Sequence, residues 1–252
     1  MFLKNDRPVI VGMLRSGCVK ELQKEIALMI NEGVDCFGFQ IELVMPKERT
    51  AENFKQLFAA MKGRPVYVTN YARCNVVEHT DEELMEELYL AAACGASLID
   101  IRGDMFDRQP GEFTEKEEAV KRQREAIKKI KAMGAQVLMS THVLRYASGE
   151  EVIKIALAQQ ERGADIVKIV TDANSEKQFL DNFKTSVLLK EEIHTPSLFL
   201  CNGSYCKKHR IFAPILGGAM FLAVENNNVG LNQPTIREAR EVLSLAGYTD
   251  LP

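Results

Sequence analysis

Residues 136–170 read QVLMSTHVLRYASGEEVIKIALAQQERGADIVKIV, and this stretch is enough to predict the fold class. Two short apolar runs, Gln136–Thr141 and Asp165–Val170, flank an amphipathic stretch at Glu150–Arg162. The runs are rich in Val, Ile and Leu without strict alternation, which is typical of strands buried on both faces of a parallel sheet. Gly163 directly after the amphipathic stretch is a helix-stop signal. The stretch therefore predicts a strand, a crossover helix and a second, parallel strand.

The same alternation recurs along the rest of the chain. Further apolar runs lie at Pro8–Met13, Asp35–Ile41, Pro65–Asn70, Ser97–Ile101, Ser197–Asn202 and Ala219–Val224, and further helical patterns at Val19–Asn31, Thr80–Ala93, Thr114–Met133 and Thr235–Ala246. Thr80 with Glu83, and Thr114 with Glu117, have the spacing of a capping box. Eight strands, mostly followed by a helix, within 252 residues predict an α/β fold, a single (β/α)8 TIM barrel that spans residues 1–252.

An open doubly wound sheet is the alternative architecture. The first strand is followed by Val-Gly-Met-Leu-Arg-Ser-Gly at residues 11–17, which is not a glycine-rich phosphate turn. The sequence therefore gives little support to a nucleotide-binding open sheet.

Composition excludes several classes of function. The formal net charge is −3, from 32 basic and 35 acidic residues, so nucleic-acid binding has no global electrostatic support. No apolar run approaches the roughly 20 residues that a membrane-spanning helix needs, and the N-terminus lacks a secretory pattern. The six cysteines follow no framework spacing, which indicates reduced thiols in a cytoplasmic protein. Cys201, Cys206 and His209 are too few for a zinc site, so we expect no metal.

In a barrel of this kind the active site lies at the C-terminal ends of the strands. Lys168 is the unusual residue there, because it interrupts an otherwise apolar strand. Burial disfavours an ammonium group and lowers its pKa, and a neutral amine is what a Schiff-base nucleophile requires. The structural alternative is a lysine that pairs with a carboxylate such as Asp100. His142 ends the neighbouring strand, where a neutral imidazole could act as general base and acid.

These residues resemble the catalytic strands of type I 3-dehydroquinate dehydratases. The resemblance rests on Ser140-Thr141-His142 after a Val-Leu-Met strand, and on Gly163-Ala-Asp-Ile-Val-Lys168-Ile. It continues in Lys208-His209-Arg210-Ile211, Gly217-Gly218 and Asn232-Gln233, and runs from Pro8 to about Ala246.

The resemblance implies roles for several residues. Lys168 would form an imine with the substrate ketone, and His142 would serve as base and then acid, without metal or cofactor. Arg210 and Gln233 would hold the substrate carboxylate, and guanidinium is well suited to grip a carboxylate with two hydrogen bonds. The resemblance also suggests a homodimer and a place in the shikimate pathway of aromatic amino acid biosynthesis.

The chain departs from the family pattern at several binding positions. The family's Glu-x-Arg pair is replaced by Gly38-Phe39-Gln40, and its arginine after the third strand aligns with Tyr71. The family glutamate that orients the histidine falls near Asn75, and the serine of the last loop falls near Val229. Candidate replacements for the lost substrate contacts are Gln40, Glu42, Arg73 and Arg102.

Three interpretations remain open at this point. The chain could dehydrate 3-dehydroquinate through rearranged contacts. It could instead be a paralogue that performs Schiff-base elimination or aldol chemistry on another carboxylated ketone. The third possibility is a non-catalytic barrel that senses a metabolite, although a sensor has no need for an amine nucleophile.

Overall fold

The computed structural model describes residues 2–3, 7–227, 232–249 and 251. Within these residues eight parallel strands form one sheet in the order β7-β6-β5-β4-β3-β2-β1-β8. The strands are β1 (Val9–Met13), β2 (Cys36–Gln40), β3 (Val66–Thr69), β4 (Leu98–Arg102), β5 (Gln136–His142), β6 (Ile166–Asp172), β7 (Ser197–Asn202) and β8 (Met220–Ala223). A single bridge between Ser197 and Gly218 joins the two ends of the sheet, so the barrel is nearly closed. The predicted TIM barrel is confirmed.

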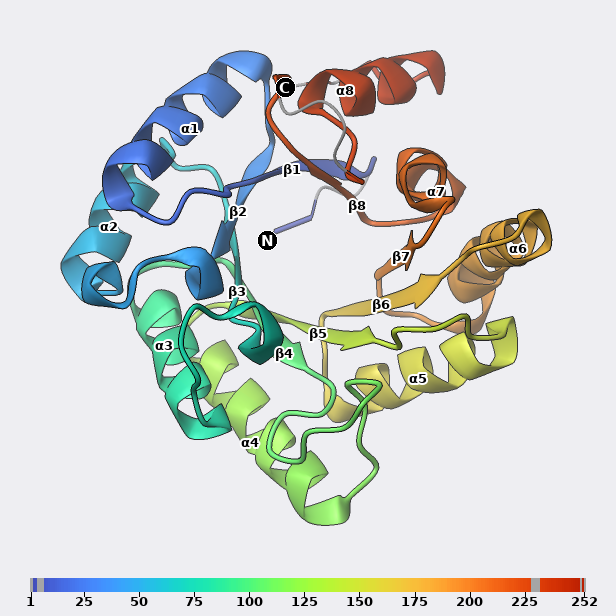
Figure 1. Cartoon of the computed structure of the whole chain (residues 1–252), viewed down its shortest axis with the longest axis horizontal. Helices are drawn as coiled ribbons and strands as arrows, with labels where there is room; N and C mark the ends of the chain where they lie inside the picture. The colour runs from blue at the N-terminus through green and yellow to red at the C-terminus, as the bar shows by residue number, and fades with distance from the viewer. Residues whose placement is uncertain (1, 4–6, 228–231, 250, 252) are drawn as a thin grey trace.

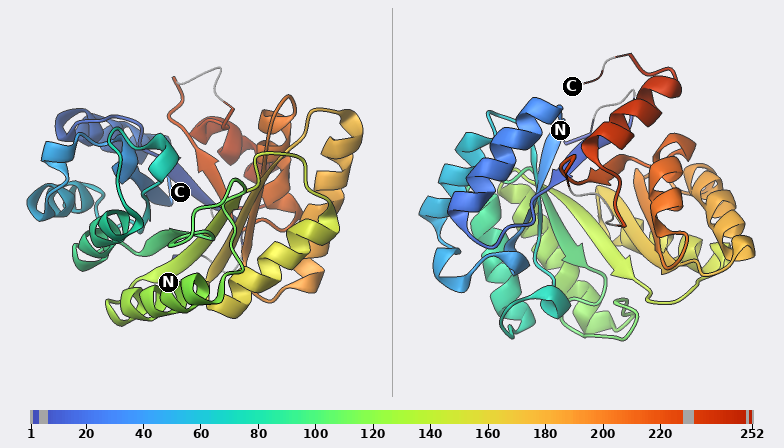
Figure 2. Two further views of the ribbon diagram at one scale, coloured as in Figure 1. Left: turned by 60° about the horizontal axis from the view of Figure 1, so that its bottom comes forward. Right: turned by 45° about the horizontal axis from the view of Figure 1, so that its top comes forward.

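A ring of helices surrounds the strands (Figure 1). They are α1 (Val19–Glu32), α2 (Ala51–Ala60), α3 (Asp81–Ala93), α4 (Glu117–Ala132), α5 (Gly149–Arg162), α6 (Glu176–Glu192), α7 (Cys206–Phe212) and α8 (Ile236–Leu245). The side views in Figure 2 show the helices packed along the outside of the barrel strands. None of the described helices is both long and apolar enough to cross a membrane.

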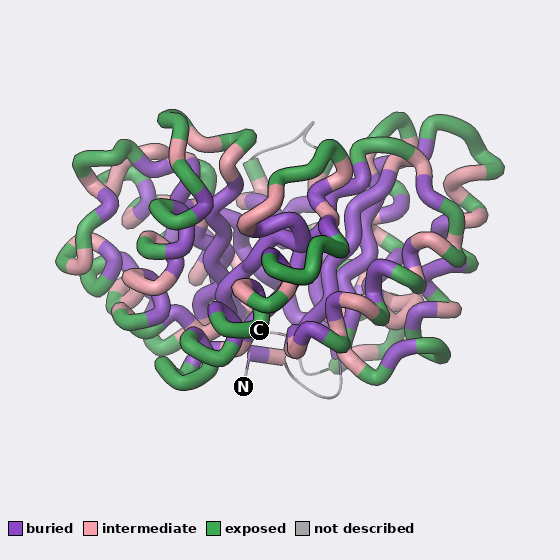
Figure 3. Tube along the Cα trace, turned by 90° about the horizontal axis from the view of Figure 1, so that it is seen from below, coloured by how far each residue is buried: buried purple, intermediate pink, exposed green. Residues whose placement is uncertain are grey.

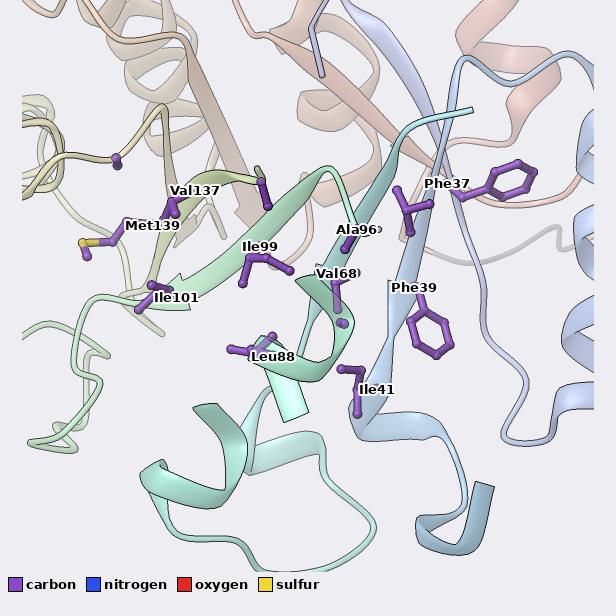
Figure 4. Packing of buried hydrophobic residues seen from close by; sticks show 14 of the residues in the cluster. Phe37, Phe39, Ile41, Val68, Leu88, Ala96, Ile99, Ile101, Val137 and Met139 are labelled. Atoms are coloured by element: carbon purple, nitrogen blue, oxygen red, sulfur yellow. The ribbon is translucent and has the colours of Figure 1, made fainter. Parts of the chain in front are cut away.

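Alternate residues of each strand face two separate apolar layers. Residues such as Ile99 and Met139 point outward to the helices, and Figure 4 shows them in this outer layer with Leu88 of α3. The intervening residues, such as Leu98 and Leu138, fill the barrel interior. Figure 3 shows the resulting buried strands inside a largely exposed outer surface. This two-sided burial explains why the strands read as continuous apolar runs.

Local capping signals were partly informative. The Thr80 capping box is present at the start of α3, with both reciprocal hydrogen bonds to Glu83. The expected box at Thr114 is wrong: α4 begins at Glu117, and the Thr114 hydroxyl instead donates to Asp107 at 2.5 Å. Thr114 and Asp107 belong to the same loop after β4, so a contact within that loop replaced the helix cap.

Candidate active site

Lys168 points into the barrel because of its place in the strand alternation. Its neighbours at two-residue spacing, Ile166 and Val170, belong to the interior apolar layer. Since side chains alternate across a strand, Lys168 faces the same side. Its own backbone is tied to α5 by Gln159, which accepts from the Lys168 amide at 3.1 Å and donates to its carbonyl at 3.2 Å. Only 3% of Lys168 is exposed.

The Lys168 amine lies in a buried polar cluster at the centre of the barrel. Its Nζ atom donates to the hydroxyl of Tyr71 at 2.6 Å, to that of Tyr67 at 3.1 Å and to Asp100 at 3.4 Å. Asp100 in turn accepts hydrogen bonds of 2.5 Å from Tyr67, Tyr71 and Ser140. Burial lowers the pKa of Lys168, while the Asp100 carboxylate opposes that shift. The structure thus shows the pairing with Asp100 that the structural alternative expected, and it places the Lys168 amine in the buried interior where the nucleophile hypothesis requires it.

His142 is held by a carboxylate from a distant loop. Its Nδ1 atom lies 2.5 Å from Oε2 of Glu112, and the side chain is 9% exposed. Burial lowers the pKa of His142 to about 4, although Glu112 opposes the shift. The pKa of Glu112 is lowered despite its burial, because His142, Arg73 and Arg102 outweigh the desolvation. At neutral pH a neutral imidazole therefore donates Nδ1–H to a carboxylate, which leaves the lone pair on Nε2.

The Glu112 assignment corrects an expectation. The resemblance placed the histidine-orienting carboxylate near Asn75, but Asn75 bonds to Arg49 at 2.8 Å and to Asn70 at 3.1 Å. Glu112 sits after β4 with a positive φ of 49°, a conformation that non-glycine residues rarely adopt. No local sequence pattern identifies Glu112, because Glu112 and His142 lie 30 residues apart in the chain.

Gly103 fixes the loop that carries Glu112. It forms a bridge to Phe113, and a Cβ atom at this position would lie 2.5 Å from Thr141 Oγ1 and 3.0 Å from the Glu112 carbonyl. We expect Gly103→Ala to lower the free energy of unfolding by about 1–3 kcal/mol, since either β5 or the loop must shift. Thermal melting measures the effect. Gly111→Ala is the matched control, because its Cβ would meet nothing closer than 3.9 Å; equal loss in both variants would contradict the explanation.

Glu42 lies beyond the end of β2 and is almost wholly buried. It accepts hydrogen bonds from the Thr69 hydroxyl at 2.8 and 3.1 Å. Burial raises its pKa to about 7, and the nearby Asp100 charge adds to this effect. Gln40, at the end of the same strand, donates its amide to the Leu14 carbonyl at 3.1 Å. Of these two residues, Glu42 carries a carboxyl whose charge changes near neutral pH.

The two candidate arginines differ in burial and in how fully their charge is paired. Arg102 is buried and held by Asp104 at 2.9 Å and Asp81 at 3.1 Å, so its charge is already neutralised. Arg73 is 37% exposed and pairs with Glu112 at 3.3 Å. Both arginines and Glu112 line a cavity of about 970 Å³ beyond β3 and β4. Lys168 and His142 are not among the residues that line it.

Arg210 and Gln233 come from the opposite side of the barrel mouth. Arg210 donates to the Cys201 carbonyl at 3.1 Å and to Asn202 at 3.0 Å, and its charge is among the groups that lower the pKa of Lys168. The Oε1 atom of Gln233 is buried and has no hydrogen-bond partner within the described part of the chain. Val229, the position aligned with the family serine, lies outside the described residues.

Sequence reasoning named Lys168, His142 and Asp100 but missed Tyr67 and Glu112 as parts of the site. Tyr67 reads as one more apolar residue of a buried strand, and Glu112 as one more loop acid. Tyr71 was noted only as a departure from the family arginine. Their contacts to Lys168 and His142 span 30 to 101 residues of sequence.

A family model and two curated proteins match this chain in sequence. The family model for type I 3-dehydroquinase matches residues 14–250. A 3-dehydroquinate dehydratase of Aromatoleum aromaticum is 22% identical over 244 residues, which cover 94% of this chain and 90% of that protein. The 3-dehydroquinate dehydratase of Pyrococcus abyssi is 32% identical over 118 residues, and this match spans only 46% of this chain and 52% of that protein.

Solved structures show the same fold at low identity. The 3-dehydroquinate dehydratase of Geobacillus kaustophilus superposes with a TM-score of 0.84 at 15% identity, covering 98% of this chain and 94% of that one. A type I 3-dehydroquinate dehydratase from Clostridium difficile, solved with covalently modified comenic acid, gives 0.82 at 16% identity and covers 96% and 94%.

Proposed function

Because the chain belongs to the type I 3-dehydroquinase family, we propose that it is a Schiff-base hydro-lyase acting on 3-dehydroquinate or a related carboxylated cyclic ketone. The observation that carries the proposal is the buried Lys168 amine on β6 with the Glu112-held imidazole of His142 on the adjacent strand β5. An amine nucleophile and a neutral base at neighbouring inward positions are what an elimination through an imine requires.

The reaction assigns one role to each group. The Lys168 nitrogen attacks the ketone carbon and water leaves, which gives a protonated imine. The Nε2 atom of His142 takes a proton from the carbon next to the imine. The carbon–oxygen bond one position further then breaks, and His142 returns the proton so that the hydroxyl departs as water. Hydrolysis of the imine releases the conjugated product and restores Lys168.

Substrate contacts are assigned to the residues around this pair. Arg210 and the Nε2–H donors of Gln233, whose Oε1 atom has no partner within the described residues, are proposed to hold the carboxylate end. Gln40, Glu42 and Arg73 are proposed to hold the ring hydroxyls, with Arg102 as a fixed, already paired part of the wall. Homodimer formation, a cytoplasmic location and a place in the shikimate pathway are part of the same proposal.

A second candidate is elimination or aldol chemistry on a different keto acid. It is favoured by Tyr71, which stands where the family arginine aligns and covers Lys168 rather than offering a free charge. It is also favoured by Gln40, whose amide is turned onto the Leu14 carbonyl. Loss of remote contacts lowers turnover as well as affinity, because those contacts orient the reacting atoms.

One assay separates the two candidates. Purified protein is mixed with 3-dehydroquinate, and the ultraviolet absorbance of the conjugated product is followed. We expect weaker turnover than that of the Geobacillus kaustophilus enzyme measured alongside. Equal turnover would show that Gln40, Glu42 or Arg73 replaces the missing clamp. No turnover, with Lys168 still trapped by borohydride on small ketones, would favour the different keto acid; no adduct at all would favour the sensor.

A further inference from the structure

Tyr71 contacts both groups to which the chemistry is assigned. Its hydroxyl accepts from Lys168 Nζ at 2.6 Å and donates to Asp100 Oδ2 at 2.5 Å. Its ring meets the imidazole of His142 edge-on, with 5.1 Å between centroids. We propose that Tyr71 is a catalytic residue that transfers protons between Lys168 and Asp100 while the imine forms and breaks. This inference rests on the proposed Schiff-base function.

Imine formation needs two opposite proton transfers near the amine. The Lys168 ammonium first gives a proton to the Tyr71 oxygen while the phenol proton passes to Asp100, leaving a neutral amine and a neutral carboxyl group. The amine lone pair then attacks the ketone carbon, and a proton moves from nitrogen to oxygen to give the carbinolamine. Asp100 returns its proton through Tyr71 to the carbinolamine hydroxyl, which leaves as water as the carbon–nitrogen double bond forms. The sum is ammonium plus ketone giving iminium plus water, with Asp100 again a carboxylate.

The contacts of Asp100 indicate which phenol carries the proton between Lys168 and Asp100. Ser140 bonds to Oδ1 at 2.5 Å, so that oxygen already has a fixed donor. Oδ2 receives both phenols and the amine. Tyr71 is the nearer phenol to the nitrogen, at 2.6 Å against 3.1 Å for Tyr67.

Position in the barrel separates the two tyrosines further. Tyr67 lies within β3 and is wholly buried, whereas Tyr71 follows the strand on its C-terminal side and is 8% exposed. The ketone reaches Lys168 from that side, so Tyr71 is the phenol beside the departing hydroxyl. Burial and Asp100 raise the pKa of Tyr71 well above its usual range, so it works as a protonated relay and not as a phenolate base.

The test compares Tyr71→Phe with Tyr67→Phe, because each variant loses one hydroxyl next to Asp100 and Lys168 and keeps its ring. Full-length protein is mixed with 3-dehydroquinate or with pyruvate as a small keto-acid probe. Borohydride is added after increasing delays, and the Lys168 adduct is quantified by mass spectrometry. A proton relay speeds formation and hydrolysis of the imine equally, so its loss changes the rate and not the equilibrium. We therefore expect Tyr71→Phe to form the adduct about 10- to 100-fold more slowly yet reach the wild-type yield. We expect Tyr67→Phe to slow adduct formation less than Tyr71→Phe does, because the Tyr67 hydroxyl lies farther from Lys168 Nζ, at 3.1 Å.

Other outcomes overturn the assignment. Wild-type rates in Tyr71→Phe would remove the proton-transfer role, and equal slowing in both variants would reduce it to general support of Asp100. A lower final yield at an unchanged rate would show that Tyr71 stabilises the imine instead. If the wild-type protein forms no adduct with either probe, the proposed function itself is refuted. The wild-type sample alone shows this result, so it cannot be confused with an effect of the variants.

Discussion

Lys168→Met is expected to abolish turnover, with a loss of at least about 10⁴-fold, because no other group can form the covalent intermediate. Met fills a similar volume in the strand and keeps the apolar contacts of the lysine stem. Its thioether cannot attack a carbonyl carbon to give an imine. Turnover is followed by product absorbance on the substrate established as above, and borohydride trapping should give no adduct at position 168.

The matched controls separate chemistry from folding. Lys154→Met removes an exposed lysine of α5 that pairs with Glu115, and should leave turnover unchanged. Lys168→Met leaves the buried Asp100 carboxylate without its cation, although Tyr67, Tyr71 and Ser140 still donate to it. Lys168→Met/Asp100→Asn removes that charge, so it should melt at a higher temperature than the single variant while staying inactive. Recovery of turnover in the double variant, or activity in Lys168→Met, would end the imine mechanism.

His142→Ala is expected to lower kcat by about 10²- to 10⁴-fold, the usual contribution of a general acid–base group. Formation of the Lys168 adduct should survive at a reduced rate, because the imidazole acts on carbon and on the leaving hydroxyl after the imine exists. Timed borohydride trapping and steady-state turnover on the same samples distinguish these steps. A variant within a few-fold of wild type would return His142 to a structural role.

The pH dependence tests the same residue without mutating it. Burial holds the pKa of His142 near 4, so the limb of kcat/KM that reports protonation of this base should lie near pH 4 and not near 6.5, and any limb near pH 7 is assigned to the Glu42 carboxyl. His142 in the unfolded chain takes up a proton below about pH 6.5, whereas His142 in the folded chain stays neutral. The contribution of His142 to the free energy of unfolding is therefore complete above that pH and is lost as pH falls toward 4. The shift corresponds to about 3 kcal/mol. Urea unfolding at several pH values measures it.

Glu112→Gln tests whether the Glu112 carboxylate sets the pKa of His142. The carboxylate stabilises the imidazolium form, so its removal should move the acid limb of kcat/KM to lower pH and reduce kcat. Glu78→Gln is the control, because Glu78 lines the same cavity but, unlike the buried Glu112, is exposed. Identical profiles for both variants would mean that Glu112 does not control His142.

The barrel, the strand that carries Lys168 and most of the inward-facing positions follow from patterns in the sequence alone. Strand alternation and helix-stop signals are local, because they depend on residues two to four apart along the chain. Ile166, Lys168 and Val170 share one face for this reason alone, and the same period places His142 on the inside of β5. The capping box at Thr80 was local too, and it was found where it was expected.

The partners of those side chains, in contrast, depend on how distant parts of the chain pack together. Glu112 reaches His142 because the loop after β4 returns over the barrel and is pinned at Gly103. Tyr71 reaches Lys168 across 97 residues because β3 and β6 converge on one narrow interior. The same packing paired Arg102 with Asp81 and Asp104 and brought the Arg162 guanidinium onto the Thr114 carbonyl. Such contacts depend on which distant loops meet in the folded chain. They also depend on how burial and neighbouring charges together set the charge of each buried group. Neither can be read from a local sequence pattern.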